Sequence, residues 1–182
     1  MGTPMRRLAN VVFFVIIALM SGGLDSPERM VAAPAPLPAG GVEQAVVIIV
    51  NQSNPVENFS FDDLRKIFLG ERSHWPNGRR ITIVMLDPSQ PERKAVLRDI
   101  YGMNEKDLNN HFIQGVFSGA VFVSPKNLAT PPDVLRFVFN VPGAIGYVRA
   151  SDVDSTVKVL RIDGRLPDDK DYRFRLTAHS GK

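Results

Sequence analysis

The sequence predicts an α/β domain in which a small mixed β-sheet is flanked by helices. Two observations predict this fold: short apolar runs rich in β-branched residues alternate with amphipathic stretches, and those stretches begin at helix-capping residues. The chain has 182 residues, of which 44% are hydrophobic and 23% charged. This length suits one domain plus a tail, and the composition excludes a disordered chain.

Charge and cysteine usage exclude several classes of function. The net charge is only +3 and no five like charges follow one another, so no nucleic-acid-binding arm is expected. The chain has no cysteine, which excludes disulfides, thiol catalysis, thiolate metal sites and a lipoprotein anchor.

The first 32 residues have the layout of a signal peptide. Arg6 and Arg7 precede an apolar run, Leu8 to Met20, and the small residues of 21–23 follow it. The run is about 13 residues long, shorter than the roughly 20 that cross a bilayer as a helix. We expect export to the periplasm or secretion, with cleavage after Gly23 or near Ala32. The alternative is an uncleaved membrane anchor, and no other membrane contact is expected.

Residues 33–43 form a Pro/Ala/Gly linker, and the predicted domain begins at residue 44. Residues 45–50 are a continuous β-branched run, typical of a buried strand. A helix is predicted to begin at Ser60 and to end near Gly70. Residues 81–86 predict the second long strand.

The next helix is predicted to be capped by Ser89, with Glu92 as the partner of a capping box. Another helix opens at Asn104, and residues 116–129 are expected to be irregular. Thr130 followed by two prolines and an acid is a strong helix start.

Strands are predicted over residues 144–148 and 157–162, and a short last strand over 172–176. The domain is accordingly expected to span residues 44–165. Residues 166–182 are predicted to be a C-terminal extension.

Three stretches resemble the periplasmic phosphate-binding proteins of ABC transporters. They are Phe59–Ile81 (FSFDDLRKIFLGERSHWPNGRRI), Val84–Val96 (VMLDPSQPERKAV) and Val141–Val148 (VPGAIGYV). The resemblance covers roughly residues 44–150 and implies a fold like one lobe of a type II periplasmic binding protein. Ile67, Phe68 and Trp75 are expected to serve core packing rather than ligand binding, and Gly143 and Gly146 to serve backbone geometry or close packing.

The same resemblance implies a phosphate site, because family members hold phosphate with helix N-termini, hydroxyls, an Arg and an Asp. Ser89 matches the Ser of a motif that reads Arg, three residues, then Ser-Gly-Thr. Met85 stands in place of the Arg, and Gln90 and Pro91 stand in place of Gly-Thr. The anion site is therefore expected to be degraded, and Met85→Arg with Pro91→Thr is expected to tighten phosphate binding.

Four residues remain as candidates for ligand binding: Ser89 and Gln90 at the helix start, and Asn51 and Ser53 after the first strand. No nucleophile–base pair, cofactor motif or metal-ligand spacing is present, so no catalytic residue, cofactor or metal is expected. The expected function is that of an exported, non-enzymatic binding domain for phosphate or another small anion. The alternative is a scaffold that docks to a transporter, sensor or other envelope protein without binding solute.

Overall fold

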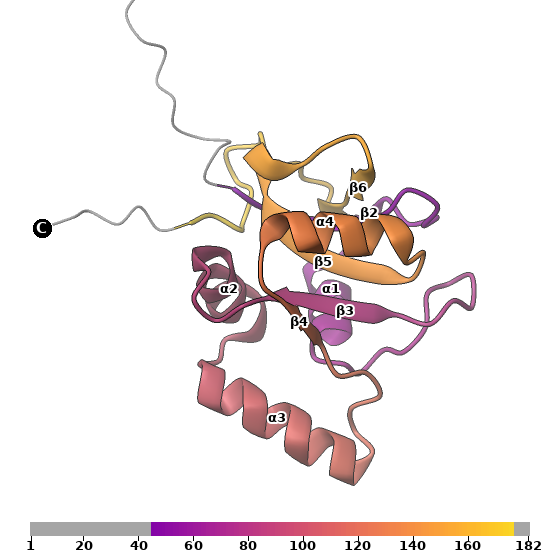
Figure 1. The fold of residues 1–182 in the computed structure, drawn as a ribbon, viewed down its shortest axis with the longest axis vertical. Coiled ribbons are helices and arrows are strands. Elements are labelled where there is room, and N and C mark those ends of the chain that lie inside the picture. The colour runs from indigo at the N-terminus through magenta and orange to yellow at the C-terminus, as the bar shows by residue number, and fades with distance from the viewer. Residues whose placement is uncertain (1–44, 177–182) are drawn as a thin grey trace, which may run out of the picture. The chain divides into compact units, whose positions relative to one another are not determined.

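A computed structural model describes residues 45–176 (Figure 1). The predicted signal peptide (1–32) and linker (33–43) lie outside the described residues. Among those residues, no helix is both long and apolar enough to cross a membrane.

A mixed five-stranded sheet forms the centre of the domain, which confirms the predicted fold class. Its strand order is β4-β3-β5-β1-β6. Strand β3 runs parallel to β4 and β5, whereas β1 runs antiparallel to β5 and β6. Strands β2 and β7 pair in parallel as a separate ribbon. The strands are β1 Val46–Asn51, β2 Asn58–Phe59, β3 Thr82–Leu86, β4 Lys126–Leu128, β5 Ala144–Arg149, β6 Val157–Val159 and β7 Arg161–Ile162.

Residues 45–176 contain four α-helices, and three of them begin at the predicted capping residue. The side chains of Ser60, Asn104 and Thr130 each accept a hydrogen bond from the backbone N–H three residues on. The helices are α1 Phe61–Phe68, α2 Pro91–Val96, α3 Glu105–Ser118 and α4 Pro131–Asn140; a π-helical turn, Leu97–Tyr101, continues α2, and a 3-10 turn, Ala150–Asp152, follows β5.

The helix after β3 differs from its prediction. Its N-cap is Gln90, which makes no side-chain capping bond, and Pro91 occupies the first turn. The predicted cap, Ser89, instead donates its hydroxyl hydrogen bond to Asp87. A carboxylate two residues before the serine competes successfully for that hydroxyl, so the capping box does not form.

Three other sequence predictions need correction. The stretch 116–129 is not wholly irregular, because α3 continues to Ser118 and Lys126–Leu128 pairs with β3 as the edge strand β4. The run 157–162 breaks into β6 and β7, which belong to different sheets. Residues 172–176 form no strand; a single bridge joins Ala45 to Arg175.

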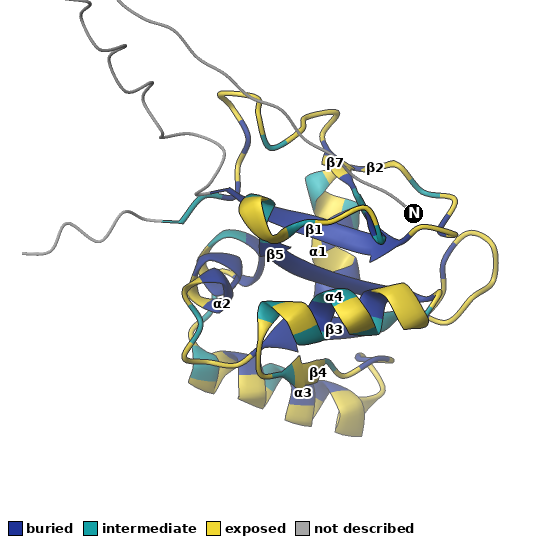
Figure 2. Cartoon of the chain, turned by 45° about the horizontal axis from the view of Figure 1, so that its top comes forward, coloured by how far each residue is buried: buried dark blue, intermediate teal, exposed yellow. Residues whose placement is uncertain are grey.

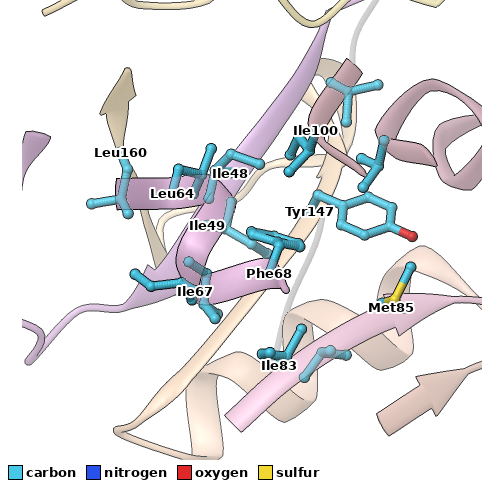
Figure 3. Close-up of a cluster of buried hydrophobic side chains, with 14 of the residues drawn as sticks. Ile48, Ile49, Leu64, Ile67, Phe68, Ile83, Met85, Ile100, Tyr147 and Leu160 are labelled. Carbon is cyan, nitrogen blue, oxygen red and sulfur yellow. The ribbon is translucent and has the colours of Figure 1, made fainter. Parts of the chain in front are cut away.

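Helices α1 and α4 cover opposite faces of the sheet (Figures 1 and 2). Two neighbouring residues of β5 face opposite sides of the sheet. A Cβ on Gly146 would lie 3.0 Å from Val134 of α4, whereas the Tyr147 ring lies 6.3 Å from that of Phe68 at the end of α1. Figure 3 shows Phe68 and Tyr147 meeting in the core. Strand β1 is buried along its whole length because both faces are covered, as predicted for it.

Trp75 and Gly143 lie in contact where the turn before β3 meets the start of β5. The Trp75 indole is buried, and its Nε1–H donates to the Gly143 carbonyl oxygen at 2.9 Å. A Cβ on Gly143 would lie 2.1 Å from the carbonyl oxygen of Arg80, so only glycine fits there. The expectation that these motif residues serve packing is confirmed.

Tyr172 and Phe174, from the predicted C-terminal extension, lie in the core. Both side chains are buried, and the Tyr172 hydroxyl donates to the carbonyl oxygen of Val46 at 3.1 Å. The chain after β7 thus packs against the first strand of the sheet.

Candidate functional site

The carboxyl ends of β3 and β4 lie side by side, because these strands are parallel and Leu86 pairs with Leu128. Helix α2 begins shortly after β3, and α4 begins shortly after β4. In open α/β sheets, ligands bind outside the carboxyl ends of the strands. We call the group formed by Asp87, Ser89, Gln90, Arg93 and Asn127 the carboxyl-edge site.

Asp87 takes the hydrogen-bond donors that Ser89 could offer to an anion. The backbone N–H and the hydroxyl of Ser89 both donate to Asp87 Oδ1, at 2.9 and 2.7 Å. The backbone hydrogen bond and then the hydroxyl hydrogen bond lower the pKa of Asp87 below its ordinary value. The carboxylate is therefore ionised at neutral pH and places negative charge where an anion would approach.

Gln90 is also engaged within the chain. Its side-chain Nε2 donates to the Ala129 carbonyl oxygen at 3.3 Å, and its backbone N–H donates to the Asp87 carbonyl oxygen at 3.0 Å. The next residue, Pro91, has no N–H. The start of α2 is thus tied to the loop before α4 by the same groups that an anion would need.

Arg93 is a buried arginine that binds a carboxylate of its own chain. Its guanidinium makes a two-pronged contact with Glu105, at 2.6 Å from Nε and 2.8 Å from Nη2. Nη1 donates to the Leu86 carbonyl oxygen at 2.7 Å and to Asn127 Oδ1 at 2.9 Å. Burial has the largest single effect and lowers the pKa of Arg93. The hydrogen bonds to Glu105 and the coulombic interactions with Tyr147, Glu105 and Tyr101 together outweigh it, so the pKa lies above its ordinary value.

The preceding residue, Glu92, pairs with the end of β5. Its carboxylate is buried, and Oε1 accepts a hydrogen bond from Arg149 Nε. The other oxygen, Oε2, has no hydrogen-bond partner among the described residues. Two successive residues of α2 therefore anchor it by ion pairs, one to α3 and one to β5.

Arg93 and Glu105 were not found from the sequence. The resemblance places an arginine four residues before the serine, but here the arginine stands four residues after Ser89. Its partner lies twelve residues further on, at the start of another helix, so no helical or strand spacing links the two. The one local signal is an arginine in the first turn of the helix that follows a buried strand.

Asn51 and Ser53 lie at the other ends of the strands, away from the carboxyl ends of β3 and β4, because β1 runs antiparallel to β5. Asn51 Nδ2 donates to the carbonyl oxygens of Val138 and Phe139, at the end of α4. Asn51 Oδ1 accepts from the N–H and hydroxyl of Ser53, and Arg79 donates to that hydroxyl. The four sequence-predicted residues therefore form two groups and do not line one site.

Met85 lies in the core rather than at the edge. It is fully buried, and the Tyr101 hydroxyl donates to its sulfur at 3.4 Å. Met85→Arg would bury a guanidinium without a partner among apolar side chains. A buried unpaired charge lowers the stability of a protein by about 3–5 kcal/mol. The expectation that this change restores a phosphate ligand does not fit the structure.

Metal-binding side chains are scattered. Among residues 45–176, no three His, Asp or Glu side chains come together as metal ligands would. His111 Nε2 lies 3.0 Å from the Leu69 carbonyl oxygen and His74 Nδ1 lies 2.8 Å from the Ser73 hydroxyl, so both rings make contacts within the chain.

The sequence matches no protein-family model and no curated protein. Solved structures do match. An ABC-type phosphate transport receptor from Vibrio cholerae superposes with a TM-score of 0.54 at 19% identity, over 70% of this chain and 50% of that one. A protein from Clostridium perfringens, described as a phosphate ABC transporter substrate-binding protein with bound phosphate, gives 0.54 at 19% identity, over 69% and 48%. PstS from Borrelia burgdorferi gives 0.53 at 16%, over 68% and 49%.

The chain shares the fold of one half of these proteins. It spans about half the length of the structures it matches, which agrees with the single lobe that the sequence predicts. The resemblance seen in the three motifs is thus confirmed as a likeness of fold.

Proposed function

We propose that the chain is an exported, non-catalytic binding module that uses a phosphate-binding-protein-like lobe to dock to another protein of the cell envelope. In this proposal its anion site is degraded and holds no phosphate tightly. The observation against a tight phosphate site is the pairing of Arg93 with Glu105: the buried guanidinium at the carboxyl edge already binds a carboxylate of the same chain.

A phosphate ion would have to displace that carboxylate. Hydrogen bonds to charged groups contribute about 1.5–3 kcal/mol each, and Arg93 makes two of them to Glu105. Glu105 belongs to the same chain and loses no translational entropy when it binds Arg93, whereas a free phosphate ion does. The ionised Asp87 adds repulsion. These terms favour millimolar or weaker affinity over a micromolar site.

A second candidate is solute binding, with a small anion held at micromolar affinity by Ser89 and Gln90. It is favoured by their position at the carboxyl ends of parallel strands and by the phosphate named for the Clostridium perfringens structure. The two candidates differ in the affinity they allow, so a titration separates them.

The decisive variant is Glu105→Ala, which leaves Arg93 without its carboxylate. By calorimetry at low salt, we expect no micromolar binding of phosphate to the parent and at least about a tenfold tighter binding to the variant. Glu71→Ala is the matched control, since Glu71 is an exposed acid of equal charge outside the carboxyl-edge site. Micromolar binding by the parent would favour the solute-binding candidate. No gain in Glu105→Ala would contradict the claim that Glu105 is what blocks the site.

Export rests on the Arg6–Arg7 pair and the apolar run after it, and on the transport proteins that share the fold. Protein recovered from the periplasm should begin between residues 22 and 36 on N-terminal sequencing. An intact Met1 on soluble cytoplasmic protein would contradict export.

A further inference from the structure

Helix α3 and the loop after it expose four large apolar side chains. The exposed fractions are 58% for Ile113, 52% for Val116, 88% for Phe117 and 57% for Phe122. The first three lie on one face of the helix, because they are three and four residues apart. We call these four residues the α3 patch. Figures 1 and 2 show α3 beyond the β4 edge of the sheet, with most of its surface exposed.

The segment around the exposed Phe122 is fixed by contacts of its neighbours. Val121 and Val123 on either side of it are buried, and the chain bends at Phe122, whose side chain is left exposed. The Phe122 N–H donates to the Gly70 carbonyl oxygen at 2.8 Å, and the Val121 N–H donates to Gly115 at 3.0 Å. The patch is a formed surface rather than a loose end.

The segment that carries the patch has no charged residue of its own. From Leu108 to Pro125 the chain has no Asp, Glu, Lys or Arg, although such residues make up 23% of the sequence. The exposed polar neighbours on α3 are the amides Asn109, Asn110 and Gln114 and the hydroxyl of Ser118. Each of these groups both donates and accepts hydrogen bonds.

We propose that the α3 patch is the contact surface of a two-fold symmetric dimer of this chain. In such a dimer each residue near the axis meets its own copy, so a charged surface would repel itself. A neutral apolar centre has no such penalty, and amides and hydroxyls can pair with their own copies. The same lack of Lys and Arg argues against an anionic membrane as the occupant. The inference does not depend on the proposed docking function.

The exposed area sets the expected strength. With about 150–250 Å² for a whole aromatic side chain, the four side chains bury about 900 Å² in total over both protomers. The amide rim brings the contact toward the lower limit of specific interfaces, about 1,200 Å². We therefore expect a weak dimer that forms in the micromolar range.

Sedimentation velocity across the micromolar range should show a concentration-dependent dimer. Phe117→Asp should weaken self-association at least about tenfold, because two carboxylates would meet near the axis. Phe139→Asp, at an exposed phenylalanine of α4, is the matched control and should leave association unchanged. The apolar segment before residue 45 is common to all variants, so their difference reports on the patch.

Introduced cysteines give a second readout, because the chain has none of its own. Under mild oxidation Ser118→Cys should form a disulfide-linked dimer, whereas Ser151→Cys, on an exposed turn after β5, should not. Adding Phe117→Asp should abolish the Ser118→Cys product. Three results would each overturn the inference: a monomer at all concentrations, a dimer that Phe117→Asp does not weaken, or binding of the patch to neutral lipid vesicles without dimers. None of these results would change the outcome of the phosphate titration.

Discussion

Replacing Trp75 by alanine should destabilise the domain by about 3–5 kcal/mol, the usual cost of truncating a buried aromatic side chain. The indole is 3% exposed, and its ring centroid lies 5.8 Å from that of Phe59. The lost hydrogen bond adds little, because the Gly143 carbonyl oxygen still accepts from the Thr82 N–H at 3.0 Å. For a domain of ordinary stability, about 5–15 kcal/mol, this is a large share of the total.

Trp75→Phe separates packing from hydrogen bonding. Phenylalanine keeps much of the apolar contact but has no N–H, so we expect a smaller loss than for alanine, of which the missing hydrogen bond accounts for about 0.5 kcal/mol, the low end of the usual range. Urea unfolding should be followed by far-UV circular dichroism, because Trp75 is the sole tryptophan and its fluorescence disappears in both variants. An alanine variant that unfolds at the parent's urea midpoint would refute the reasoning. Equal losses in the two variants would mean that the hydrogen bond, not packing, dominates.

Three further changes have defined outcomes. Gly143→Ala should lower the melting temperature markedly, because its Cβ would lie 2.1 Å from a backbone oxygen; an unchanged melting curve would mean that the backbone can move there. Ser89→Ala should raise the pKa of Asp87 toward its ordinary value, because both Ser89 donors lower it and only the N–H remains; NMR titration of the Asp87 carboxyl carbon measures this. The lowered pKa contributes stability that is lost as pH falls through the pKa of the folded state, and this contribution should be smaller in the variant. Phe174→Ala should cost about 3–5 kcal/mol in urea unfolding although it lies near the chain end, and a negligible loss would show that residues after β7 are dispensable.

Features with a local signal could be predicted from the sequence. The caps Ser60, Asn104 and Thr130 depend on a contact three residues away, and the apolar strands depend on runs of five or six residues. Such signals are contained in a short window of sequence. The predicted helix start at Ser89 shows how they fail: the serine hydroxyl donates to Asp87 and caps no helix, and the N-cap is Gln90.

Features that depend on distant partners could not be predicted. Strand β4 consists of Lys126, Asn127 and Leu128, which are polar or partly exposed and show no alternation; it is a strand because β3 offers a free parallel edge. The contact between Arg93 and Glu105 likewise depends on how α2 and α3 pack.

The candidate site illustrates the same limit. Ser89 and Gln90 lie at the sheet edge that the resemblance implies, but their engagement with Asp87 and Ala129 follows from loop geometry alone. Asn51 is the last residue of a strand that runs the other way, so it lies at the opposite ends of the strands. Strand direction, which no residue pattern in this chain states, decides which polar residues can share a site.

Titration calorimetry of the unmodified protein with inorganic phosphate at low salt tests the central claim most directly. The account predicts millimolar affinity or no detectable heat, because Glu105 holds Arg93 and Asp87 holds the donors of Ser89. Micromolar binding that Ser89→Ala or Gln90→Ala weakens at least about tenfold would contradict it and would make the carboxyl edge a working anion site.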